Sequence, residues 1–431
     1  MIARLKQSKL ARNTLWLLSG QGLRFLTQAA YFSIIARSLG TSNYGAFVSA
    51  AAMVAIASPF ASLGSGNLMI RDVARDQSKF RKCWGNALLR TLSFGLVMVA
   101  LMALIARFAL PKDIPLRLVL LISLADMIGL NLIIVSSSAF QALEQMNWTS
   151  GIWVALSLSR FLAALLLTLS FAHPTALQWS YAYLASTSLV VAGCLALVTA
   201  RLGLPRLGLM QQKRDLLEGF FFSTSFSAQT IYNDLDKAML GRLGTLQATG
   251  IYGAAYRIIE VCFAPVLALL SASYPRFFAV GTEGIAASLA FARPLVSRVF
   301  VFSCALSVAL CASAGLLPTV LGAQYAEAAT ALRWLAPILP LRSIHAFYSD
   351  VLTSVGRQGL RTALQVGVAV VNAVANLWLI PAFSWKGAAW SSVGCDALLV
   401  LLAVSAVHLV LRSSARISLL PDVRETLGEA L

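Results

Sequence analysis

Residues 13–50 read NTLWLLSGQGLRFLTQAAYFSIIARSLGTSNYGAFVSA and predict two helices separated by a short break. The first part, up to residue 36, is apolar over about the 20 residues that a helix needs to cross a bilayer. Asn43, Tyr44 and Gly45 then interrupt the pattern, because Asn and Gly favour turns. The first segment is too long for a signal peptide and lacks a small-residue cleavage site, so we expect it to be retained. This stretch is typical of a membrane-spanning helical hairpin.

The composition shows that the apolar pattern extends over the whole chain. Of 431 residues, 58% are hydrophobic and 12% are charged, whereas a soluble domain carries about 25% charged residues. This excludes an ordinary soluble enzyme and an intrinsically disordered chain. Twelve segments are long and apolar enough to span a bilayer: residues 13–36, 44–64, 83–106, 118–140, 148–171, 178–200, 219–241, 249–274, 294–319, 330–355, 362–383 and 387–411. We therefore predict an all-α polytopic membrane protein.

The basic residues are distributed unevenly between the predicted loops. Lys and Arg number 34 and Asp and Glu 17, which gives a net charge of +17. If the N-terminus is cytoplasmic, most basic residues outside the spans lie on the cytoplasmic side, chiefly in residues 1–12, 65–82 and 201–218. Cytoplasmic loops of membrane proteins show this bias. We therefore predict that both termini are cytoplasmic, and the positive charge requires no nucleic-acid partner.

The chain resembles itself at a period near 205 residues. Four positions of the first half, Arg37, Gly45, Ala50 and Arg71, recur 205 residues later as Arg242, Gly250, Ala255 and Arg276. The predicted halves are residues 1–201 and 219–411, with a cytoplasmic linker at 202–218 and a cytoplasmic tail at 412–431. Because each half has an even number of spans, both enter the membrane in the same direction. Transporters with such repeats bind substrate between the repeats near the bilayer midplane, so we predict a central cavity between two six-helix lobes.

Polar side chains form a stripe along one face of the first predicted span. They are Gln21, Arg24, Gln28 and Tyr31, and their spacing of three or four residues puts them on one helix face. An ionisable group at the centre of a membrane helix costs about 2.5 to 3.5 kcal/mol, so such groups usually face the protein interior or water. We expect this stripe to line the central cavity.

Three further spans carry polar residues at helical spacing. The seventh has Ser223, Ser227, Thr230, Asp234 and Lys237, the eighth has Tyr252, Tyr256, Arg257 and Glu260, and the tenth has Arg342, His345 and Asp350. The candidate substrate-binding residues of the cavity are Gln21, Arg24, Gln28, Lys237, Tyr256, Arg257 and Arg342. Arg24 and Arg257 are the foremost of these, because a guanidinium binds phosphate through paired hydrogen bonds.

Four acidic residues in the spans are candidates for ion coupling: Asp126, Asp234, Glu260 and Asp396. Other interpretations stay open, because a neighbouring Ser or Asn can hold Asp126 or Asp396 and Lys237 can neutralise Asp234. Arg90, Arg160, Arg298 and Arg333 stand alone in their spans, and for them a structural role is the preferred interpretation. The six cysteines and three histidines form no metal-binding motif, so we expect no metal and no other cofactor.

Two segments resemble a known family. Residues 13–50, followed by LGSGNLMIRDVAR at 63–75, resemble the N-terminal signature of the polysaccharide-biosynthesis branch of the MOP (multidrug, oligosaccharidyl-lipid, polysaccharide) exporter superfamily. DLDKAMLGRLGTLQATGIYGAAYRIIEVCFAP at 234–265 resembles that family's seventh and eighth helices. The resemblance covers essentially the whole chain and implies a MATE-like fold. Related lipid II flippases have two further helices, for which this chain has no room.

The resemblance implies a Wzx-type flippase of the bacterial cytoplasmic (inner) membrane. Such a protein moves an undecaprenyl-pyrophosphate-linked oligosaccharide by alternating access during the synthesis of O-antigen (lipopolysaccharide), capsule or exopolysaccharide. Coupling to a proton gradient, to a Na⁺ gradient or to the membrane potential stays open. Family members bind the anionic head group through basic cavity residues, which implies this role for Arg24 and Arg257. The implied partners are the polyprenyl-pyrophosphate-linked glycan, the lipid bilayer, a polysaccharide polymerase and the chain-length machinery.

Two other classes of protein stay open as alternatives. A drug or cation antiporter of the same superfamily would need an acidic cavity instead of a basic one. A membrane enzyme of the same pathway, such as a polymerase or ligase, would need a catalytic constellation. The outer loops predicted here are short and carry no pair of nucleophile and base, so we expect a transporter that is not an enzyme.

Overall fold

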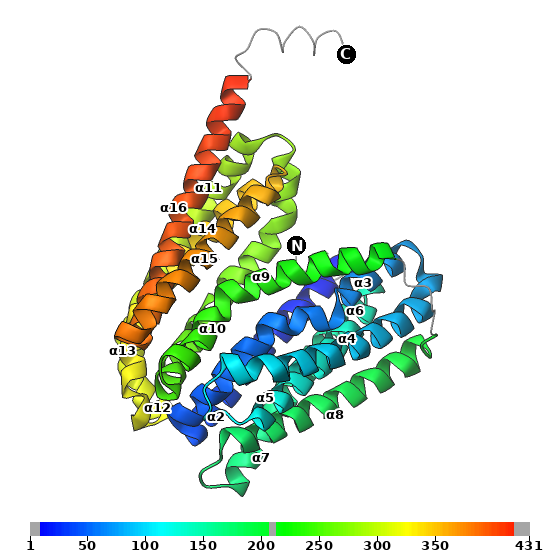
Figure 1. Ribbon diagram of the computed structural model, residues 1–431. Helices are drawn as coiled ribbons and strands as arrows, with labels where there is room; N and C mark the ends of the chain where they lie inside the picture. Colours follow the sequence, from blue (N-terminus) through cyan, green and yellow to red (C-terminus); the bar gives the residue numbers. More distant parts are fainter. Residues whose placement is uncertain (1–8, 207–212, 418–431) are drawn as a thin grey trace. The chain divides into compact units, whose positions relative to one another are not determined.

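The computed structural model describes residues 9–206 and 213–417, and every regular element within these residues is a helix (Figure 1). The prediction of an all-α fold is therefore confirmed. Residues 1–8, residues 207–212 of the predicted linker and residues 418–431 of the predicted tail lie outside the described residues. The chain forms two compact units: unit 1 comprises Met1–Ala254 and Leu317–Ala328, and unit 2 comprises Ala255–Leu316 and Ala329–Leu431. The halves at 1–201 and 219–411 describe a repeat, not these units, and stay a prediction.

Unit 1 contains the helices of the first half of the chain, α9 with the start of α10, and a short segment at Leu317–Ala328. They are α2 (Lys9–Ser62), α3 (Ser65–Arg75), the 3-10 helix η1 (Gln77–Lys79), α4 (Phe80–Ala109), α5 (Leu116–Ser123), the π-helix η2 (Leu124–Leu130), α6 (Asn131–Ala142), α7 (Met146–Ser170), α8 (Ala176–Leu202), α9 (Lys213–Leu243), the start of α10 (Leu246–Gly281), α12 (Leu317–Leu321) and the 3-10 helix η4 (Ala323–Tyr325).

Unit 2 contains the rest of α10 and the C-terminal helices. These are α11 (Ile285–Ser313), the 3-10 helix η3 (Ala314–Leu316), most of α13 (Ala326–Leu335), α14 (Ile338–Ser354), α15 (Gln358–Phe383) and α16 (Trp385–Ile417).

Helix α2 holds the first two predicted spans and bends sharply between them. The bend lies at Gly40, whose φ of 74° and ψ of 170° are readily adopted only by glycine. The sequence prediction, which placed the break at residues 43–45, was therefore wrong by a few residues. Asn43 has another function, since its Oδ1 accepts a hydrogen bond from the backbone N–H of Ala176 at 3.2 Å and so helps to start α8.

Nine helical segments among the described residues are long and apolar enough to cross a membrane. One of them, Gln21–Arg75, contains the second predicted span and residues 21–36 of the first. The seventh and tenth predicted spans, which lie on α9 and on α13 with α14, do not meet the same criterion. The reason is polarity in α9 and length in α14, which has 17 residues. The chain is thus a multi-pass membrane protein.

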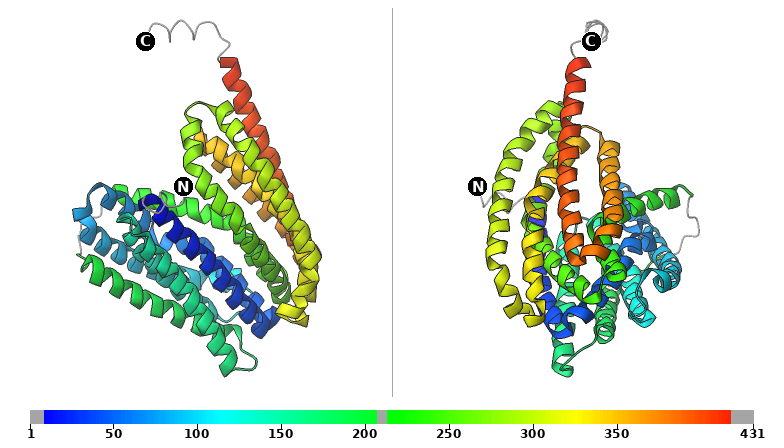
Figure 2. Two further views of the ribbon diagram at one scale, coloured as in Figure 1. Left: turned by 180° about the vertical axis from the view of Figure 1, so that it is seen from behind. Right: turned by 60° about the vertical axis from the view of Figure 1, so that its left-hand side comes forward.

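Unit 1 is built around α2, which packs along α4, α7 and α9 (Figure 2). Large side chains fill the spaces between these helices: Trp84 of α4 is fully buried, and Trp179 of α8 is 1% exposed. The Trp179 and Tyr183 rings of α8 both contact Phe47 of α2, with centroids 6.1 and 5.4 Å away. These aromatic contacts fix α8 against the second part of α2.

Glycines allow α2 and the start of α10 to approach closely within unit 1. A Cβ added at Gly45 would overlap the carbonyl oxygen of Leu246, and a Cβ added at Gly250 would overlap that of Thr41. Gly45 and Gly250 are equivalent in the 205-residue repeat, and so are Thr41 and Leu246. The two contacts are therefore reciprocal, as a two-fold relation between the two helix pairs would make them.

Unit 2 contains α14 packed between α11 and α16, with α15 against α16 (Figure 1). Buried amides connect α15 and α16. Asn372 Nδ2 donates to Ser391 Oγ at 3.1 Å, and Ser391 Oγ donates to Asn376 Oδ1 at 2.6 Å. Such hydrogen bonds between helices contribute about 0.6 to 2 kcal/mol each in membrane proteins. They hold the hairpin that α15 and α16 form.

Candidate functional site

Arg24 of α2 lies against an aromatic ring of α7. Its guanidinium carbon is 4.6 Å from the centroid of the Trp153 ring, which is a cation–π distance. Trp153 is held in turn, because its Nε1 donates a hydrogen bond to Ser137 Oγ of α6 at 3.2 Å. A guanidinium that contacts a ring through its face directs its N–H groups to acceptors in its own plane. Trp153 therefore orients a charge suited to binding an anion such as phosphate through paired hydrogen bonds.

The polar stripe of the first span approaches α7 at a second position, two helical turns from Arg24. At this position Tyr31 of α2 lies close to Arg160 of α7. Between these positions Gln28 is half-buried, and Gln21 at the start of the stripe is exposed. The stripe thus shares one face, as its spacing predicted, and that face lies toward α7. Its position in a substrate cavity stays a prediction.

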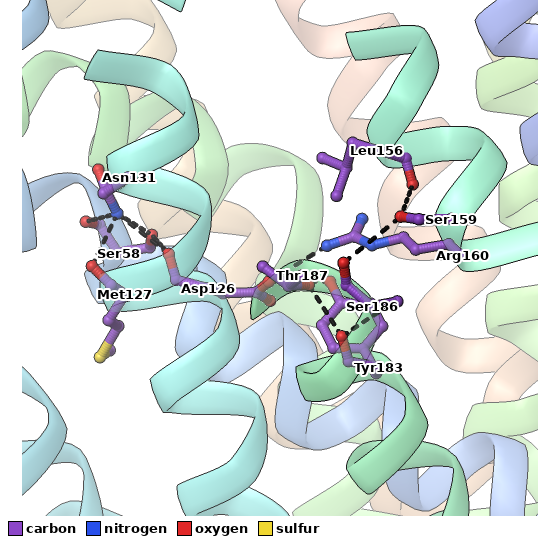
Figure 3. Close-up of polar contacts among 10 residues, drawn as sticks. All are labelled: Ser58, Asp126, Met127, Asn131, Leu156, Ser159, Arg160, Tyr183, Ser186 and Thr187. Atoms are coloured by element: carbon purple, nitrogen blue, oxygen red, sulfur yellow. Dashed lines mark hydrogen bonds and ion pairs between the residues drawn. The ribbon is translucent and has the colours of Figure 1, made fainter. Parts of the chain in front are cut away.

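Asp126 forms a buried polar cluster with side chains of α7 and α8 (Figure 3). Its Oδ1 accepts a hydrogen bond from Tyr183 Oη at 2.8 Å and lies 3.7 Å from Arg160 Nη2. The guanidinium carbon of Arg160 is 4.1 Å from the centroid of the Tyr183 ring. Asp126 is 8% and Arg160 9% exposed. Asp126 and Arg160 each lack an oppositely charged residue in their own span, and they neutralise each other between two neighbouring helices of unit 1.

Asp126 lies in the π-helix η2, where one extra residue per turn changes the direction of the side chains. A side-chain amide provides hydrogen bonds to the carbonyl groups of this π-helix. Asn131 Nδ2 donates to the backbone oxygens of Asp126 and Met127, both at 3.1 Å. Ser58 Oγ of α2 also donates to the Asp126 oxygen, at 3.2 Å. Ser58 and Asn131 thus donate hydrogen bonds to the backbone carbonyl of Asp126, whereas its carboxylate interacts with Tyr183 and Arg160. Such π-helical turns are frequent at functional sites.

Lys237 and Asp234 of α9 form an ion pair with each other. Lys237 Nζ is 2.5 Å from Asp234 Oδ1 and also donates to the backbone oxygen of Asn233 at 3.3 Å. The next acidic residue, Asp236, accepts a hydrogen bond from Tyr252 Oη of α10. This geometry supports the interpretation that Lys237 neutralises Asp234. For Lys237 as a substrate ligand, the positive charge of its side chain is the supporting argument.

The serines of the seventh-span stripe face α2. Ser223 Oγ donates to the backbone oxygen of Pro59 at 2.8 Å, and Ser227 Oγ donates to that of Ile56 at 2.7 Å. Pro59 cannot donate the backbone hydrogen bond that a helix interior requires. These serines therefore stabilise α9 against the part of α2 that the proline disturbs.

A second polar cluster joins three helices within unit 2. Arg342 of α14 donates through Nη2 to Tyr256 Oη of α10 at 2.8 Å and lies 3.5 Å from Asp396 Oδ2 of α16. His345 Nε2, one turn along α14, is 3.0 Å from Asp396 Oδ1. The Arg342 guanidinium carbon is 5.7 and 5.9 Å from the ring centroids of Tyr256 and Phe263. The structure thus brings together three predicted residues, Tyr256, Arg342 and Asp396.

Arg257 and Glu260 pair on α10 as their spacing predicted. Arg257 Nη1 donates to Glu260 Oε2 at 2.8 Å, and each side chain is 31% exposed. This pair is more accessible than either buried cluster. Arg257 can exchange its carboxylate for a stronger anion at a smaller desolvation cost than a buried arginine.

Two aromatic residues of these clusters, Trp153 and Tyr183, were not predicted as site residues. Trp153, Ser157 and Arg160 recur at intervals of four and three residues, and this polar face of α7 was the available signal. Among the described residues, no group of three or more His, Cys, Asp or Glu side chains is arranged to hold a metal ion.

Residues 10–280 match the family described as "Polysaccharide biosynthesis protein". No curated protein matches the chain in sequence. Solved structures match it in fold. An inward-facing multidrug resistance MATE family transporter of the MOP superfamily has a TM-score of 0.74 at 14% identity, covering 90% of this chain and 96% of that one.

Two other solved structures show the same fold. The inward closed conformation of the lipid II flippase MurJ gives a TM-score of 0.70 at 11% identity, with 91% of this chain and 87% of that chain covered. A MOP superfamily transporter from Pyrococcus furiosus gives 0.63 at 14% identity, with 94% and 97% covered. At these identities the likeness concerns the fold alone.

Proposed function

Because the chain belongs to the polysaccharide biosynthesis protein family, we propose that it is a flippase for a lipid-linked oligosaccharide. The substrate proposed is an undecaprenyl-pyrophosphate-linked unit of O-antigen, capsule or exopolysaccharide. The chain moves it from the inner to the outer leaflet of the bacterial cytoplasmic membrane by alternating access. Its two termini lie in the cytoplasm, and a polysaccharide polymerase and chain-length machinery receive the product. The protein catalyses no covalent reaction.

The observation that carries this proposal is the placement of Arg24 on Trp153 in a membrane-spanning helix. An arginine in this position costs free energy on insertion, and an aromatic ring and an anionic ligand both offset that cost. A pyrophosphate offers the paired oxygens that a guanidinium binds best. Arg257, with its accessible ion pair, is the corresponding candidate in unit 2. A drug or cation antiporter of the same superfamily would instead need acidic groups in its cavity to bind a cation.

The driving force follows from the charge of the head group. An anion that leaves a negative cell interior gains roughly 2.3 kcal/mol per charge for each 100 mV of membrane potential. The membrane potential alone can therefore drive export. A proton or Na⁺ gradient is the alternative, and the acidic groups Asp126, Asp234, Glu260 and Asp396 are its candidates.

Proteoliposomes test the proposal directly. The purified chain is reconstituted with a fluorescent undecaprenyl-pyrophosphate oligosaccharide, and an impermeant reagent then destroys the label that is exposed on the outer leaflet. We expect the protected half of the label to become accessible in vesicles that hold the protein, and to do so faster with an imposed potential. Equal protection in empty and protein-containing vesicles would overturn the proposal, as would transport of a cationic dye with no movement of the lipid.

A further inference from the structure

Six exposed basic residues of unit 1 lie in two segments that are far apart in the sequence. The segments are the turn between α3 and α4 and the end of α8, and the residues are Arg75, Lys79, Arg81, Lys82, Arg201 and Arg206. The two segments are in contact, because the backbone N–H of Arg206 donates to the backbone oxygen of Arg81 at 2.9 Å. Both belong to loops predicted to be cytoplasmic. We call these six residues the basic surface.

The chain brings these charges together at a close approach between α4 and the end of α8. A Cβ added at Gly203 would lie 2.5 Å from Arg81 Nη2, so the guanidinium of Arg81 packs on the backbone just after α8. Arg201 and Arg206 lie two residues before and three residues after this glycine. Like charges placed in this way repel each other, and an anion bound among them removes part of the repulsion. The basic surface therefore favours a negatively charged ligand.

The acidic residues around the basic surface offset only part of its charge. The turn between α3 and α4 contains one acidic residue, Asp76, whose Oδ2 is 3.4 Å from Lys79 Nζ. The Lys79 side chain nevertheless stays 63% exposed. Asp72 of α3 bonds through Oδ1 to Arg71 Nε at 2.7 Å, and Arg71 is not part of the basic surface. A third acidic residue, Glu144, lies in the turn between α6 and α7. The six basic residues thus outnumber these acidic groups.

The neighbours of the basic surface have the chemistry of a membrane interface. The guanidinium carbon of Arg201 is 5.0 Å from the centroid of the Trp148 ring, and tryptophans are enriched where the bilayer meets water. Farther along α4, Leu89 is 42% and Leu96 is 59% exposed. Leu89 follows Lys82 by seven residues, which is about 10 Å along a helix. Positive charge is thus followed by exposed apolar surface, in the order in which a phospholipid presents its phosphate and its acyl chains.

We propose that the basic surface binds the phosphate groups of anionic phospholipids in the leaflet that it faces. Each Lys or Arg close to a membrane surface strengthens binding to anionic lipid about fivefold. The ligand reaches an exposed surface from the side, within the bilayer. A phospholipid is favoured over a soluble phosphate because the exposed leucines of α4 continue the surface toward the acyl chains. The proposal does not depend on the proposed function, since these lipids belong to the bilayer and are not transported.

Native mass spectrometry of the full-length protein, purified in detergent, tests the proposal by measuring the affinity for added lipid. The probes are phosphatidylglycerol and phosphatidylcholine with identical acyl chains, because the two lipids differ in the charge of the head group. We expect phosphatidylglycerol to bind about tenfold or more tightly than phosphatidylcholine. Inorganic phosphate, which has the charge without the chains, should not displace it at an equal concentration.

A triple variant removes the charges at the contact between the two segments: Arg81→Gln, Lys82→Gln and Arg206→Gln. It should bind phosphatidylglycerol about tenfold or more weakly and leave phosphatidylcholine binding unchanged. The double variant Arg81→Lys with Arg206→Lys keeps the charge and should keep the affinity. If thermal unfolding shows that the triple variant does not fold, Lys79→Gln with Lys82→Gln replaces it, because this pair leaves the contact of Arg81 with Gly203 intact.

The matched control removes three exposed charges near the other end of α4 and in the segment after it: Arg107→Gln, Lys112→Gln and Arg117→Gln. This control should bind phosphatidylglycerol as the wild type does. Equal affinity of the wild type for the two lipids would overturn the proposal, and so would a triple variant that keeps the preference for phosphatidylglycerol. Displacement of phosphatidylglycerol by an equal concentration of inorganic phosphate would also overturn it, because the surface would then bind free phosphate and not lipid.

Discussion

Val48 of α2 and Gly253 of α10 pack against each other, and they are equivalent positions of the 205-residue repeat. A Cβ added at Gly253 would lie 2.9 Å from Val48 Cγ1. A local two-fold relation between the second part of α2 and the start of α10 would bring a residue into contact with its own repeat equivalent. The contacts of Gly45 with Leu246 and of Gly250 with Thr41 join the same two helix segments and are reciprocal in the same sense.

This symmetry predicts matched effects of two distant substitutions. Gly45→Leu and Gly250→Leu each push a side chain into a backbone carbonyl of the facing helix, so each should lower the free energy of unfolding by about 1 to 3 kcal/mol. Thermal unfolding in detergent measures the loss. Gly193→Leu is the control, because Gly193 of α8 is exposed and a Cβ added there meets no atom within 4 Å. A large effect at one glycine and none at the other would contradict the reciprocal contact.

The second prediction concerns the arginine that Trp153 orients. Arg24→Ala should slow flipping of the lipid-linked oligosaccharide about tenfold or more, since a charge-assisted hydrogen bond contributes about 1.5 to 3 kcal/mol. The proteoliposome assay at matched protein level measures the rate. Arg107→Ala, at an exposed site near the end of α4, should leave it unchanged. Wild-type flipping by Arg24→Ala would exclude Arg24 from the anion site.

The spacing of polar residues in the sequence was sufficient to predict which of them share a helix face. It could not predict which residues of other helices each face contacts. The interval between Arg24 and Tyr31 predicts a shared face because α-helical geometry is local. That the face meets Trp153 and Arg160 depends on the packing of α2 against α7, more than 120 residues away along the chain. The same limit explains why Arg160 looked isolated, although its carboxylate partner Asp126 lies on a neighbouring helix.

Backbone irregularities were the other source of error. A hydropathy pattern assumes 3.6 residues per turn, so it cannot reveal the π-helix that redirects Asp126. Residues 43–45 were chosen as the break because Asn and Gly favour turns. The bend instead requires a positive φ at a single residue, and that residue is Gly40. The all-α class was predictable, because a bilayer leaves a chain of this composition few other ways to satisfy its backbone groups.

The third prediction tests the buried pair of Asp126 and Arg160. Either single substitution, Asp126→Asn or Arg160→Met, leaves one buried charge without its partner and should destabilise the protein by about 3 kcal/mol or more. The double variant should lose less than the sum of the two. Thermal unfolding in detergent gives the three values, with Asp113→Asn at an exposed loop position as the control. Additive losses would show that the two side chains do not interact.

The fourth prediction distinguishes a ligand-binding role of Arg257 from a purely structural one. A partly exposed pair at this spacing contributes about 0 to 1 kcal/mol to stability, so Arg257→Ala and Glu260→Ala should both fold normally. If the pair only braced α10, the two variants would behave alike in transport. If Arg257 binds the pyrophosphate, its loss should weaken binding of inorganic pyrophosphate, whereas Glu260→Ala should strengthen it, because a competing carboxylate is removed from the guanidinium. Isothermal titration of both variants decides between these outcomes, and equal affinities in the two would remove Arg257 from the anion site.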